Sequence, residues 1–360
     1  MNRNTGMNAG QIIGTMGGKQ VFGLDIAKHV FQLHTVDMST GEIANVQIKR
    51  AKVLEHFVNK PKSLIALEAC GGAHHWARTL LAMGHKVKLL PAKHVRAFVL
   101  RDKTDALDAQ AIWIAAQQPH IKDVSVKSEQ QQACLALHSM RQQLMKMRIM
   151  QTNALRGLLY EFGIVLPVGH SKLLGSIQSE MTQAQLNNRL PDIVVLSVQE
   201  QLKRIDAMQE DIDGLSKRLI ALLKQNQQML AVQAIPGVGP LTATALVASV
   251  GNVLPFKSGR HFASWLGLTP RQVGTGGKTQ QLGISKRGDT YLRTLLIAGA
   301  RSIVGRSAHN GWIERLLQRR HFNVVVAAVA NKMARTVWAV LAKGAAFDQV
   351  KWSPAEPVAV

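Results

Sequence analysis

The sequence predicts an α/β domain with a mixed sheet, then a long helical segment, and finally a mainly helical C-terminal unit. Between residues 20 and 124, apolar residues alternate with polar ones or form short runs, which is typical of strands. Between 125 and 230 they recur at steps of three and four, which is typical of helices. Aromatic residues make up only 5% of a chain that is 46% apolar, and its 360 residues suffice for two or three domains.

Five strands and two helices account for the N-terminal pattern. Residues 21–26, 30–37 and 42–49 follow one another closely, so we expect an antiparallel meander. The run 63–68 is apolar as a buried parallel strand should be, and a fifth strand over 85–90 ends at Pro91. Helices are expected over 74–83 and 102–116. The first 18 residues are Gly-rich without an apolar run, so we expect a flexible N-terminus rather than a signal peptide.

Two long helices are predicted in the middle of the chain, over 128–160 and 197–230. An apolar seam at helical spacing runs along the second of them: Leu202, Ile205, Met208, Ile212, Leu215, Leu219 and Leu222. Such a seam fits an internal pair of antiparallel helices as well as a coiled coil between two copies of the chain. The stretch 163–192 between the helices has weak periodicity and is expected to be a loop-rich connection.

The C-terminal unit, 231–345, opens with a turn between two helices. This turn carries Gly237 and Gly239 just before Pro240, which suits the first position of a helix. Its N–H groups could approach a phosphate as in a helix-hairpin-helix element, although a plain tight turn fits equally well. The apolar run 322–342 contains Lys332 and Arg335, so a buried helix is expected rather than a membrane span. The tail 346–360 is expected to be loose.

Positive charge dominates the composition. Lys and Arg number 44 against 22 Asp and Glu, for a net charge of +22. From 255 to 344 there are fifteen Lys or Arg against two acids. Such a chain needs a polyanionic partner, so nucleic acid is favoured over an anionic membrane surface, and a small-metabolite enzyme is disfavoured. Two cysteines, Cys70 and Cys134, cannot build a disulfide scaffold and fit a reducing cytoplasm.

Four acids of the N-terminal domain lie at predicted strand ends or on one face of a predicted helix. Asp25 follows the first strand, Glu68 ends the fourth, and Asp105 and Asp108 lie three residues apart on one helix face. Carboxylates that meet at one sheet edge repel each other unless a divalent cation lies among them. The pattern therefore predicts a Mg²⁺ or Mn²⁺ site for phosphoryl transfer. Each acid taken alone fits a turn or a helix terminus better than a catalytic role, and it is the set of four that favours function.

The segment 266–289 combines glycines with cations and hydroxyls. Four basic residues in or just after this segment are expected to bind phosphate oxygens: Lys278, Lys286, Arg287 and Arg293. The glycines indicate a mobile loop, in which Thr275 or Ser285 could act as a nucleophile. Arg301 opens a further basic row with Arg306, Arg315, Arg319 and Arg320, for which the alternative is a solvated helix face.

Several ordered motifs resemble those of the DEDD-type transposases of the insertion-sequence-110 family, most of all its 1111-type branch, with the Piv invertases as relatives. The resemblance covers about 21–344. It is carried by Gly-Leu-Asp-Ile-Ala-Lys at 23–28, Leu-Glu-Ala at 67–69 and Lys-Thr-Asp-Ala-Leu-Asp-Ala at 103–109. Further carriers are 235–240, 266–271, Gly-Gly-Lys at 276–278 and Ser-Lys-Arg-Gly-Asp at 285–289. Lys28, in the first motif, joins the residues expected to bind nucleic acid.

The resemblance implies a RuvC-like domain of RNase H fold over 19–124, with Asp25, Glu68, Asp105 and Asp108 as its acids. It implies a coiled-coil region over 125–230 that helps to form homodimers or homotetramers, and a C-terminal transposase domain with a nucleophilic serine. It also implies a noncoding bridge RNA that pairs with the target and with the DNA ends of the element, in a bacterial, nucleoid-associated, cytoplasmic protein without a membrane partner.

The chain departs from the family at the nucleophile. Many members have a serine before the paired glycines, whereas this sequence reads Gly274-Thr275-Gly276-Gly277-Lys278. If the residue directly before the glycines aligns, Thr275 is the nucleophile. If the residue before it aligns, Gly274 supplies none, and the chain uses Ser285 or is inactive. A RuvC-like nuclease with metal-activated water and a non-catalytic nucleic-acid-binding protein remain as alternatives.

Overall fold

The computed structural model describes residues 20–99, 104–187, 189–306, 311–344 and 346–352. The chain divides into two compact units after Glu129. The expected flexible N-terminus and the part of the expected loose tail from 353 onward lie outside the described residues. The expectation of a loose tail is wrong for 346–352, where Phe347 packs against the core of the second unit and Trp352 is buried in it.

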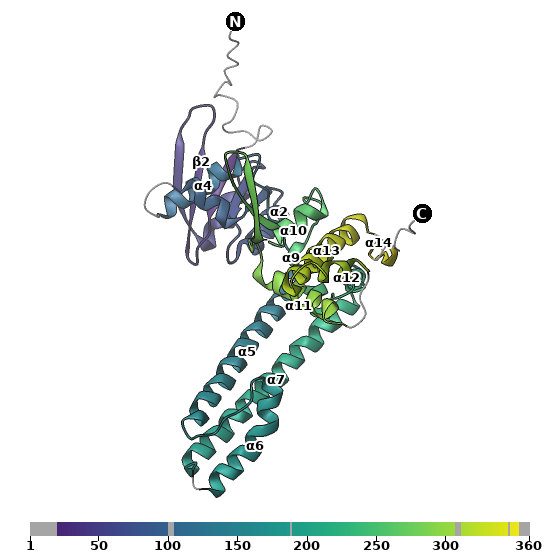
Figure 1. Ribbon diagram of the computed structural model, residues 1–360. Coiled ribbons are helices and arrows are strands. Elements are labelled where there is room, and N and C mark those ends of the chain that lie inside the picture. The colour runs from purple at the N-terminus through teal and green to yellow at the C-terminus, as the bar shows by residue number, and fades with distance from the viewer. Residues whose placement is uncertain (1–19, 100–103, 188, 307–310, 345, 353–360) are drawn as a thin grey trace, which may run out of the picture. The chain divides into compact units, whose positions relative to one another are not determined.

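A five-stranded mixed sheet forms the centre of the first unit, with strand order β3-β2-β1-β4-β5 (Figure 1). The strands are β1 (Val21–Asp25), β2 (Val30–Val36), β3 (Ile43–Lys49), β4 (Leu64–Glu68) and β5 (Lys86–Leu90). Strand β1 pairs antiparallel with β2, and β2 with β3, whereas β1, β4 and β5 run parallel. The predicted meander and the two buried parallel strands are therefore confirmed.

Helices cover both faces of this sheet. On one face, α1 (Val53–Val58) and α2 (Ala73–Ala82) bury Phe22, Leu24 and Leu67. On the other, α3 (Ala92–Val95) and α4 (Asp105–Ala116) bury Val21 and Ala66. The 3₁₀ turns η2 (Arg50–Lys52) and η3 (Arg96–Phe98) complete the connections. The pattern had predicted α2 and α4 but not α1 and α3, which are too short to show a helical period.

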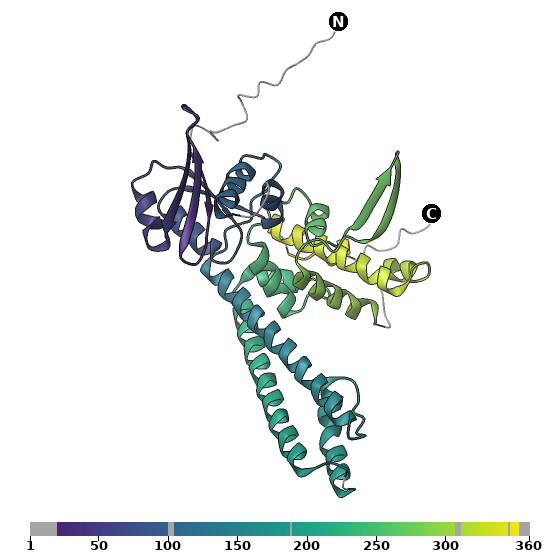
Figure 2. The same cartoon turned by 90° about the vertical axis from the view of Figure 1, so that its left-hand side faces the viewer.

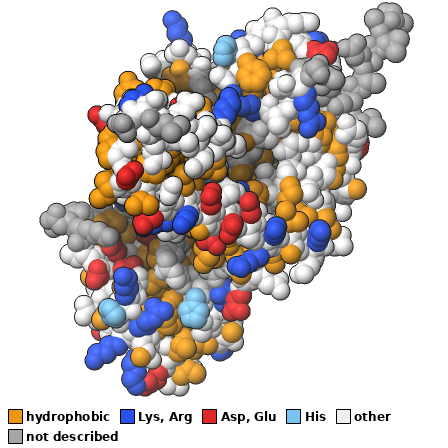
Figure 3. Space-filling view, turned by 90° about the horizontal axis from the view of Figure 1, so that it is seen from below, with side chains coloured by type: hydrophobic (Ala, Val, Ile, Leu, Met, Phe, Trp, Pro, Cys, Tyr) orange, Lys and Arg blue, Asp and Glu red, His pale blue; other side chains and the backbone are white. Residues whose placement is uncertain are grey.

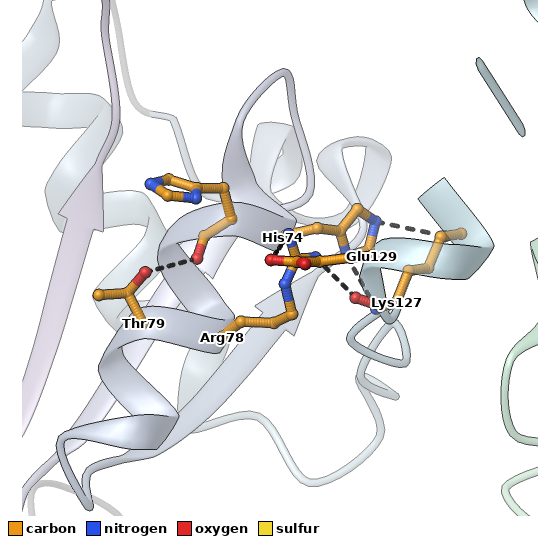
Figure 4. Close-up of polar contacts among 6 residues, drawn as sticks. His74, Arg78, Thr79, Lys127 and Glu129 are labelled. Atoms are coloured by element: carbon orange, nitrogen blue, oxygen red, sulfur yellow. Dashed lines mark hydrogen bonds and ion pairs between the residues drawn. The ribbon is translucent and has the colours of Figure 1, made fainter. Parts of the chain in front are cut away.

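The segment that leaves the sheet is fastened to α2 (Figure 4). The Lys127 N–H donates to His74 Nδ1 at 3.2 Å, and the Arg78 guanidinium donates to the Lys127 carbonyl at 2.8 Å. Burial, followed by the charges of Lys127 and Arg78, lowers the pKa of His74 to about 4. The imidazole is therefore neutral at pH 7 and can accept the backbone hydrogen bond. Nothing in the sequence pattern pointed to this clamp.

A helical arm opens the second unit, and its long helices lie side by side in both views (Figures 1 and 2). It consists of α5 (Glu129–Tyr160), α6 (His170–Leu186) and α7 (Asp192–Lys224). The seam residues Ile205, Met208, Ile212, Leu215 and Leu219 are buried within the chain, so an internal helix pair accounts for them. Polar cross-links join the pair, such as Arg141 Nε to Ser216 Oγ at 2.8 Å.

The expected loop-rich connection over 163–192 is wrong, because α6 occupies most of it. Leu173, Ile177, Met181 and Ala184 are buried at steps of three and four, and they pack into the same core as α5 and α7. This apolar stripe is narrow, and most of the remaining residues of the helix are polar, with three Ser and three Gln among them. That composition weakens the periodicity without preventing a helix that is held by tertiary packing.

The remaining helices pack around α13 (Phe322–Lys343). They are α8 (Gln227–Gln233), α9 (Pro240–Val250), α10 (Gly259–Trp265), α11 (Thr290–Val304), α12 (Gly311–Leu317) and α14 (Gln349–Trp352). By length and composition, α13 is apolar enough to cross a membrane, yet Val329, Met333 and Val337 on it are fully buried within the unit. The prediction of a buried core helix is confirmed.

The expected mobile loop within 266–289 is wrong in part, because an antiparallel ribbon forms there. Strand β6 (Pro270–Thr275) pairs with β7 (Lys278–Ile284) through a two-residue turn at Gly276 and Gly277. Both glycines have positive φ, 55° and 79°, which suits a type I′ hairpin turn, whose twist matches that of the flanking strands. Glycines that suggest mobility are thus the residues that close the turn.

Candidate functional site

Three acids of the first unit converge at the carboxyl end of β1. Asp25 is the last residue of that strand, while Asp105 and Asp108 lie in the first turn of α4. Each contributes a carboxylate oxygen, and these oxygens all lie within 4.8 Å of one another. The structure therefore brings together three of the four acids that the sequence predicts for a metal site.

The start of α4 gives these acids their places. The Thr104 hydroxyl caps the helix by accepting the Leu107 N–H at 3.4 Å, and the Thr104 carbonyl accepts the Asp108 N–H at 2.9 Å. The helix therefore begins at Asp105, and positions three apart share a face. Acids in the first turn also interact favourably with the helix dipole.

Gly23 lets α4 come close enough to β1. A Cβ on Gly23 would lie 2.3 Å from the Ala109 carbonyl oxygen and 2.7 Å from the Trp113 nitrogen. Any larger residue would push the helix off the strand, and Asp105 and Asp108 would move with it. The Trp113 indole fastens the same contact by donating to the Val21 carbonyl at 3.2 Å. The sequence analysis missed this role, although a glycine inside an apolar strand signals a close backbone approach.

Glu68 lies one strand away from the group of three. The register pairs Leu24 with Leu67, so Glu68 ends β4 at the level where Asp25 ends β1. Glu68 lies outside the 4.8 Å group. Both carboxylates act on Cys70, an exposed thiol at the same edge of the sheet. Partial burial, then the negative charges of Glu68 and Asp25, raise the pKa of this thiol. The fourth predicted acid therefore belongs to the same electrostatic neighbourhood.

The donor set fits a hard divalent cation. All three groups offer carboxylate oxygens, which Mg²⁺ prefers, and two opposite ligands of Mg²⁺ lie about 4.2 Å apart at ~2.1 Å each. At most one pair among three ligands can be opposite, and adjacent ligands lie about 3.0 Å apart, so the three oxygens, all within 4.8 Å of one another, would draw together around the ion. Larger or more tolerant cations such as Mn²⁺ suit the same oxygens.

In the second unit, Thr275 stands at the tip of the β6–β7 ribbon. It pairs with Lys278 across the two-glycine turn, and both residues are exposed. Every residue of β6 is exposed, and so is every residue of β7 except Ile284. A two-stranded ribbon with so little buried surface gains little stability from its own packing. It presents the hydroxyl of Thr275 and the ammonium of Lys278 to solvent together.

Ser285 lies in a more tightly held segment at the base of the ribbon. Its N–H donates to the Thr269 carbonyl at 2.8 Å, and the Lys286 N–H donates to the Gly267 carbonyl at 3.1 Å. Lys286 has a φ of 55°, in a region that non-glycine residues rarely adopt. A Cβ on Gly288 would lie 2.0 Å from the Trp265 carbonyl. The segment is thus built to hold Lys286 in a strained conformation, at a cost of about 1 kcal/mol or more.

A broad basic groove of about 1890 Å³ runs along α13 and reaches Ser285. Among its lining residues in the described part of the chain, the only acid is Asp348. The basic residues that line it are Arg260, Arg271, Lys286, Arg301, Lys332, Arg335 and Lys343. Lys332 lies 4.6 Å from the Trp312 ring centre and 4.9 Å from that of Trp352. Burial, then the charge of Arg335, lowers the pKa of Lys332. The groove offers the electrostatics that a polyanion needs.

Several other residues expected to act on DNA do not line this groove, and one of them, Arg293, makes hydrogen bonds within the protein. Thr275, Lys278, Arg287 and Arg293 are absent from its described lining. Arg293 donates to the Leu266 carbonyl at 3.3 Å and to the Thr290 hydroxyl at 3.2 Å. It therefore helps to hold the ribbon's base in place.

The turn before α9 is shaped by packing. A Cβ on Gly237 would lie 2.7 Å from Ile303 Cδ1 and 2.9 Å from the Gly299 carbonyl, so α11 excludes a side chain there. Gly239 is exposed with open space beside it, and Pro240 occupies the first turn of α9 as predicted. The absence of a side chain at Gly237 thus has a structural cause, whereas phosphate binding by Gly237 and Gly239 stays a prediction.

Comparison with known proteins gives matches to both units. A family described as "Transposase IS116/IS110/IS902 family" matches residues 229–317, and the DEDD transposase family of IS110, described as "Transposase", matches 22–164. A probable family 20 transposase of Pseudomonas aeruginosa is 41% identical over 327 residues, which cover 89% of this chain and 96% of the relative. The IS1111A transposase of Coxiella burnetii is 36% identical, with 90% of each chain covered. The pilin gene-inverting protein of Moraxella bovis is 28% identical over 34% of this chain and 40% of its own length.

Proposed function

Because the chain belongs to the IS116/IS110/IS902 transposase family, whose members cut and rejoin DNA, we propose that it is a site-specific recombinase of an insertion sequence. In this proposal it acts by phosphoryl transfer through a covalent hydroxyl–DNA intermediate. The convergence of Asp25, Asp105 and Asp108 at one sheet edge carries the proposal, because it is the arrangement that metal-dependent phosphoryl transfer requires. The strand order supports a RuvC-like domain of RNase H fold.

Asp25, Asp105 and Asp108 would hold the cation, with Glu68 reaching it directly or through water. When bound, Mg²⁺ or Mn²⁺ would polarise the scissile phosphate and offset its developing negative charge. The carboxylates would make the site selective for hard cations, and a cation held between them would attract and orient the phosphate. Cys70 lies near Glu68 and Asp25 and is not required as a ligand in this scheme.

We assign the attack to Thr275. Its hydroxyl oxygen forms a bond to phosphorus and releases its proton to a base, while the bond from phosphorus to one deoxyribose oxygen breaks and that oxygen takes up a proton. Rejoining reverses this order, since a deoxyribose hydroxyl attacks the threonyl phosphoester and Thr275 regains its proton. The exposed place of Thr275 beside Lys278 supports the assignment, because the ammonium can neutralise the phosphate that the hydroxyl approaches.

Lys28, Lys278, Lys286, Arg287, Arg293 and Arg301 would contact the backbones of the element ends and of the target. The groove along α13 supports this for Lys286 and Arg301, which line it. A noncoding bridge RNA would select both DNA sites by base pairing, which suits contacts that read phosphates rather than bases. The net charge of +22 is compatible with two nucleic acids at once.

We also propose that the chain works as a homodimer or homotetramer on the bacterial nucleoid, in the cytoplasm and without a membrane partner. Several large apolar side chains of the arm are exposed, among them Met140 at 54%, Met150 at 64% and Ile193 at 75%. Hydrophobic side chains are also exposed among charged ones on the face in Figure 3. Apolar surface of this kind suits contact with a second copy of the chain.

The test is to trap the covalent intermediate. The full-length protein is incubated with Mg²⁺, DNA of the element ends and the flanking noncoding transcript, and a denaturant-resistant adduct is mapped by mass spectrometry. We expect an adduct on Thr275 that is lost in Thr275→Ala and in Asp105→Ala. An adduct on Ser285 would keep the function and move the nucleophile. Cutting without an adduct would favour the metal-water nuclease, and binding alone would favour a non-catalytic protein.

A further inference from the structure

A second, smaller groove lies in the first unit, and Lys28 is the one residue of it that the proposed function uses. Its volume is about 680 Å³. The turn between β1 and β2 forms one wall, the end of β3 with η2 forms another, and the start of α2 closes it. Five of its lining residues have basic side chains: Lys28, His29, Lys49, Arg50 and His75.

The walls of this groove are joined by specific contacts. The Arg50 N–H donates to the His29 carbonyl at 2.8 Å, which ties η2 to the β1–β2 turn. The Arg50 guanidinium carbon lies 5.1 Å from the Trp76 ring centre and 5.8 Å from that of Phe31. Because both rings belong to the core, the guanidinium is held in place rather than free to sweep through solvent. The positive charge of the groove is therefore preorganised.

The groove contains no acid among its described lining residues. Glu55, the acid on neighbouring α1, makes an ion pair with Lys52 at 2.6 Å. Three basic side chains, Lys28, Lys49 and Arg50, thus share this groove with two imidazoles that can donate hydrogen bonds. Like charges gathered in this way repel each other, and an external anion relieves that repulsion.

The chain leads from the acidic site into this groove along two paths. Lys28 follows Asp25 by three residues, across the turn that leaves β1, and His75 follows Glu68 by seven, in the first turn of α2. A nucleic-acid strand with one phosphate at the carboxylates would therefore present neighbouring phosphates to these loops. A small phosphorylated ligand would fill one part of the cavity and leave the other cations unmatched.

We propose that this groove is a binding site for the sugar-phosphate backbone of a nucleic-acid strand next to its scissile phosphate, with Lys28, Lys49 and Arg50 as its main contacts. The inference rests on the proposed function for its ligand class. It adds a site that holds a polynucleotide independently of metal and of the basic groove along α13. Backbone recognition of this kind is independent of base sequence.

The test compares two double variants of the full-length protein with the same net charge. Lys28→Ala/Lys49→Ala removes two groove cations, whereas Lys60→Ala/Lys86→Ala removes two exposed lysines of the same unit that do not line the groove. Binding of one fluorescent 20-nucleotide sequence, as DNA and as RNA, is measured in EDTA across a range of salt concentrations. Thermal unfolding checks that both variants fold.

We expect the slope of log affinity against log salt to fall by about 1.4 in the groove variant, at ~0.7 per single-strand phosphate contact. The control should keep the wild-type slope, and Lys28→Arg/Lys49→Arg should restore it. A loss for DNA alone would identify the strand as DNA, and a loss for both oligonucleotides would identify a shared backbone site. Equal slopes in the groove and control variants would overturn the inference while leaving the proposed function intact. A wild-type protein that binds neither oligonucleotide would contradict both.

Discussion

At the scale of single residues, the acidic site depends on one missing side chain as much as on three carboxylates. The acids were predictable, because strand ends and the first turn of a helix are places where polar side chains meet at a sheet edge. The role of Gly23 was not recognised. A side chain is excluded there only because the Ala109 carbonyl and the Trp113 nitrogen pack against it in the folded domain. The constraint comes from an element about ninety residues further along the chain, and its one local sign is a glycine inside an apolar strand.

Gly23→Ala should therefore damage the metal site without replacing any ligand. The added methyl would meet the Ala109 carbonyl at 2.3 Å, so α4 must move and carry Asp105 and Asp108 away from Asp25. We expect Mn²⁺ affinity, measured by electron paramagnetic resonance, to fall roughly 10- to 100-fold, as it does when a group that orients ligands is changed. Gly71→Ala is the control, since a Cβ there meets nothing within 4 Å. Unchanged Mn²⁺ affinity in Gly23→Ala would show that α4 does not set the geometry.

At the scale of elements, the long helices and the five strands followed from hydrophobic period, whereas α6 and the β6–β7 ribbon did not. The apolar stripe of α6 is narrow, and the ribbon is almost wholly exposed, so neither shows the strong pattern that burial imposes. The Gly276–Gly277 pair was a usable hairpin signal, and interpreting it as mobility was wrong. Polar contacts between elements were also beyond prediction, because His138 on α5 meets Thr244 on α9 and Tyr291 on α11 only in the folded unit.

Substitutions in the turn of the β6–β7 ribbon should show whether DNA cutting depends on the shape of the tip that carries Thr275. Gly277 has a φ of 79°, which a β-branched residue adopts only under strain, so Gly277→Val should distort the tip that carries Thr275. We expect DNA cutting to fall about tenfold or more, by loss of positioning. The melting temperature should fall by no more than a few °C, because strain of about 1–3 kcal/mol is confined to an exposed ribbon that packs little against the core. Gly276→Asn, which keeps a favoured hairpin turn, should retain cutting. Full activity in Gly277→Val would show that the tip geometry is unimportant.

The buried His138 should make the second unit sensitive to acid. Burial, with the charge of Arg141, lowers the pKa of His138 to about 4, below its ordinary 6.5. Between these pH values the imidazole binds a proton in the unfolded chain but not in the folded one. The free energy of unfolding should therefore fall as pH drops from about 6.5 to 4, on the order of 1 kcal/mol per pH unit. His138→Gln should flatten this part of the profile in urea titrations, whereas exposed His29→Gln should not. An unchanged slope in His138→Gln would argue against a neutral buried imidazole.

At the scale of the whole molecule, the candidate metal site and most of the excess positive charge lie in different units of the chain. The acids that can hold a cation lie in the first unit, and most of the uncompensated positive charge lies between 255 and 344 in the second. Composition alone therefore predicted a nucleic-acid partner, and ordered motifs predicted the family that the comparisons then showed. The sequence placed one boundary near 124, close to the division after Glu129. A further boundary near 230 stays a prediction.

The central claim is that Asp25, Asp105 and Asp108 hold a cation that the protein uses to cut DNA. The most direct measurement is Mg²⁺-dependent cutting of element-end DNA by the full-length protein and by Asp105→Asn, with Mn²⁺ binding measured on the same samples. Asp192→Asn, in the first turn of α7, is the matched control. We predict that Asp105→Asn loses Mn²⁺ binding and cutting together, by at least about 100-fold, with its melting temperature retained. Normal cutting by Asp105→Asn, or cutting by the wild type in EDTA, would contradict the account.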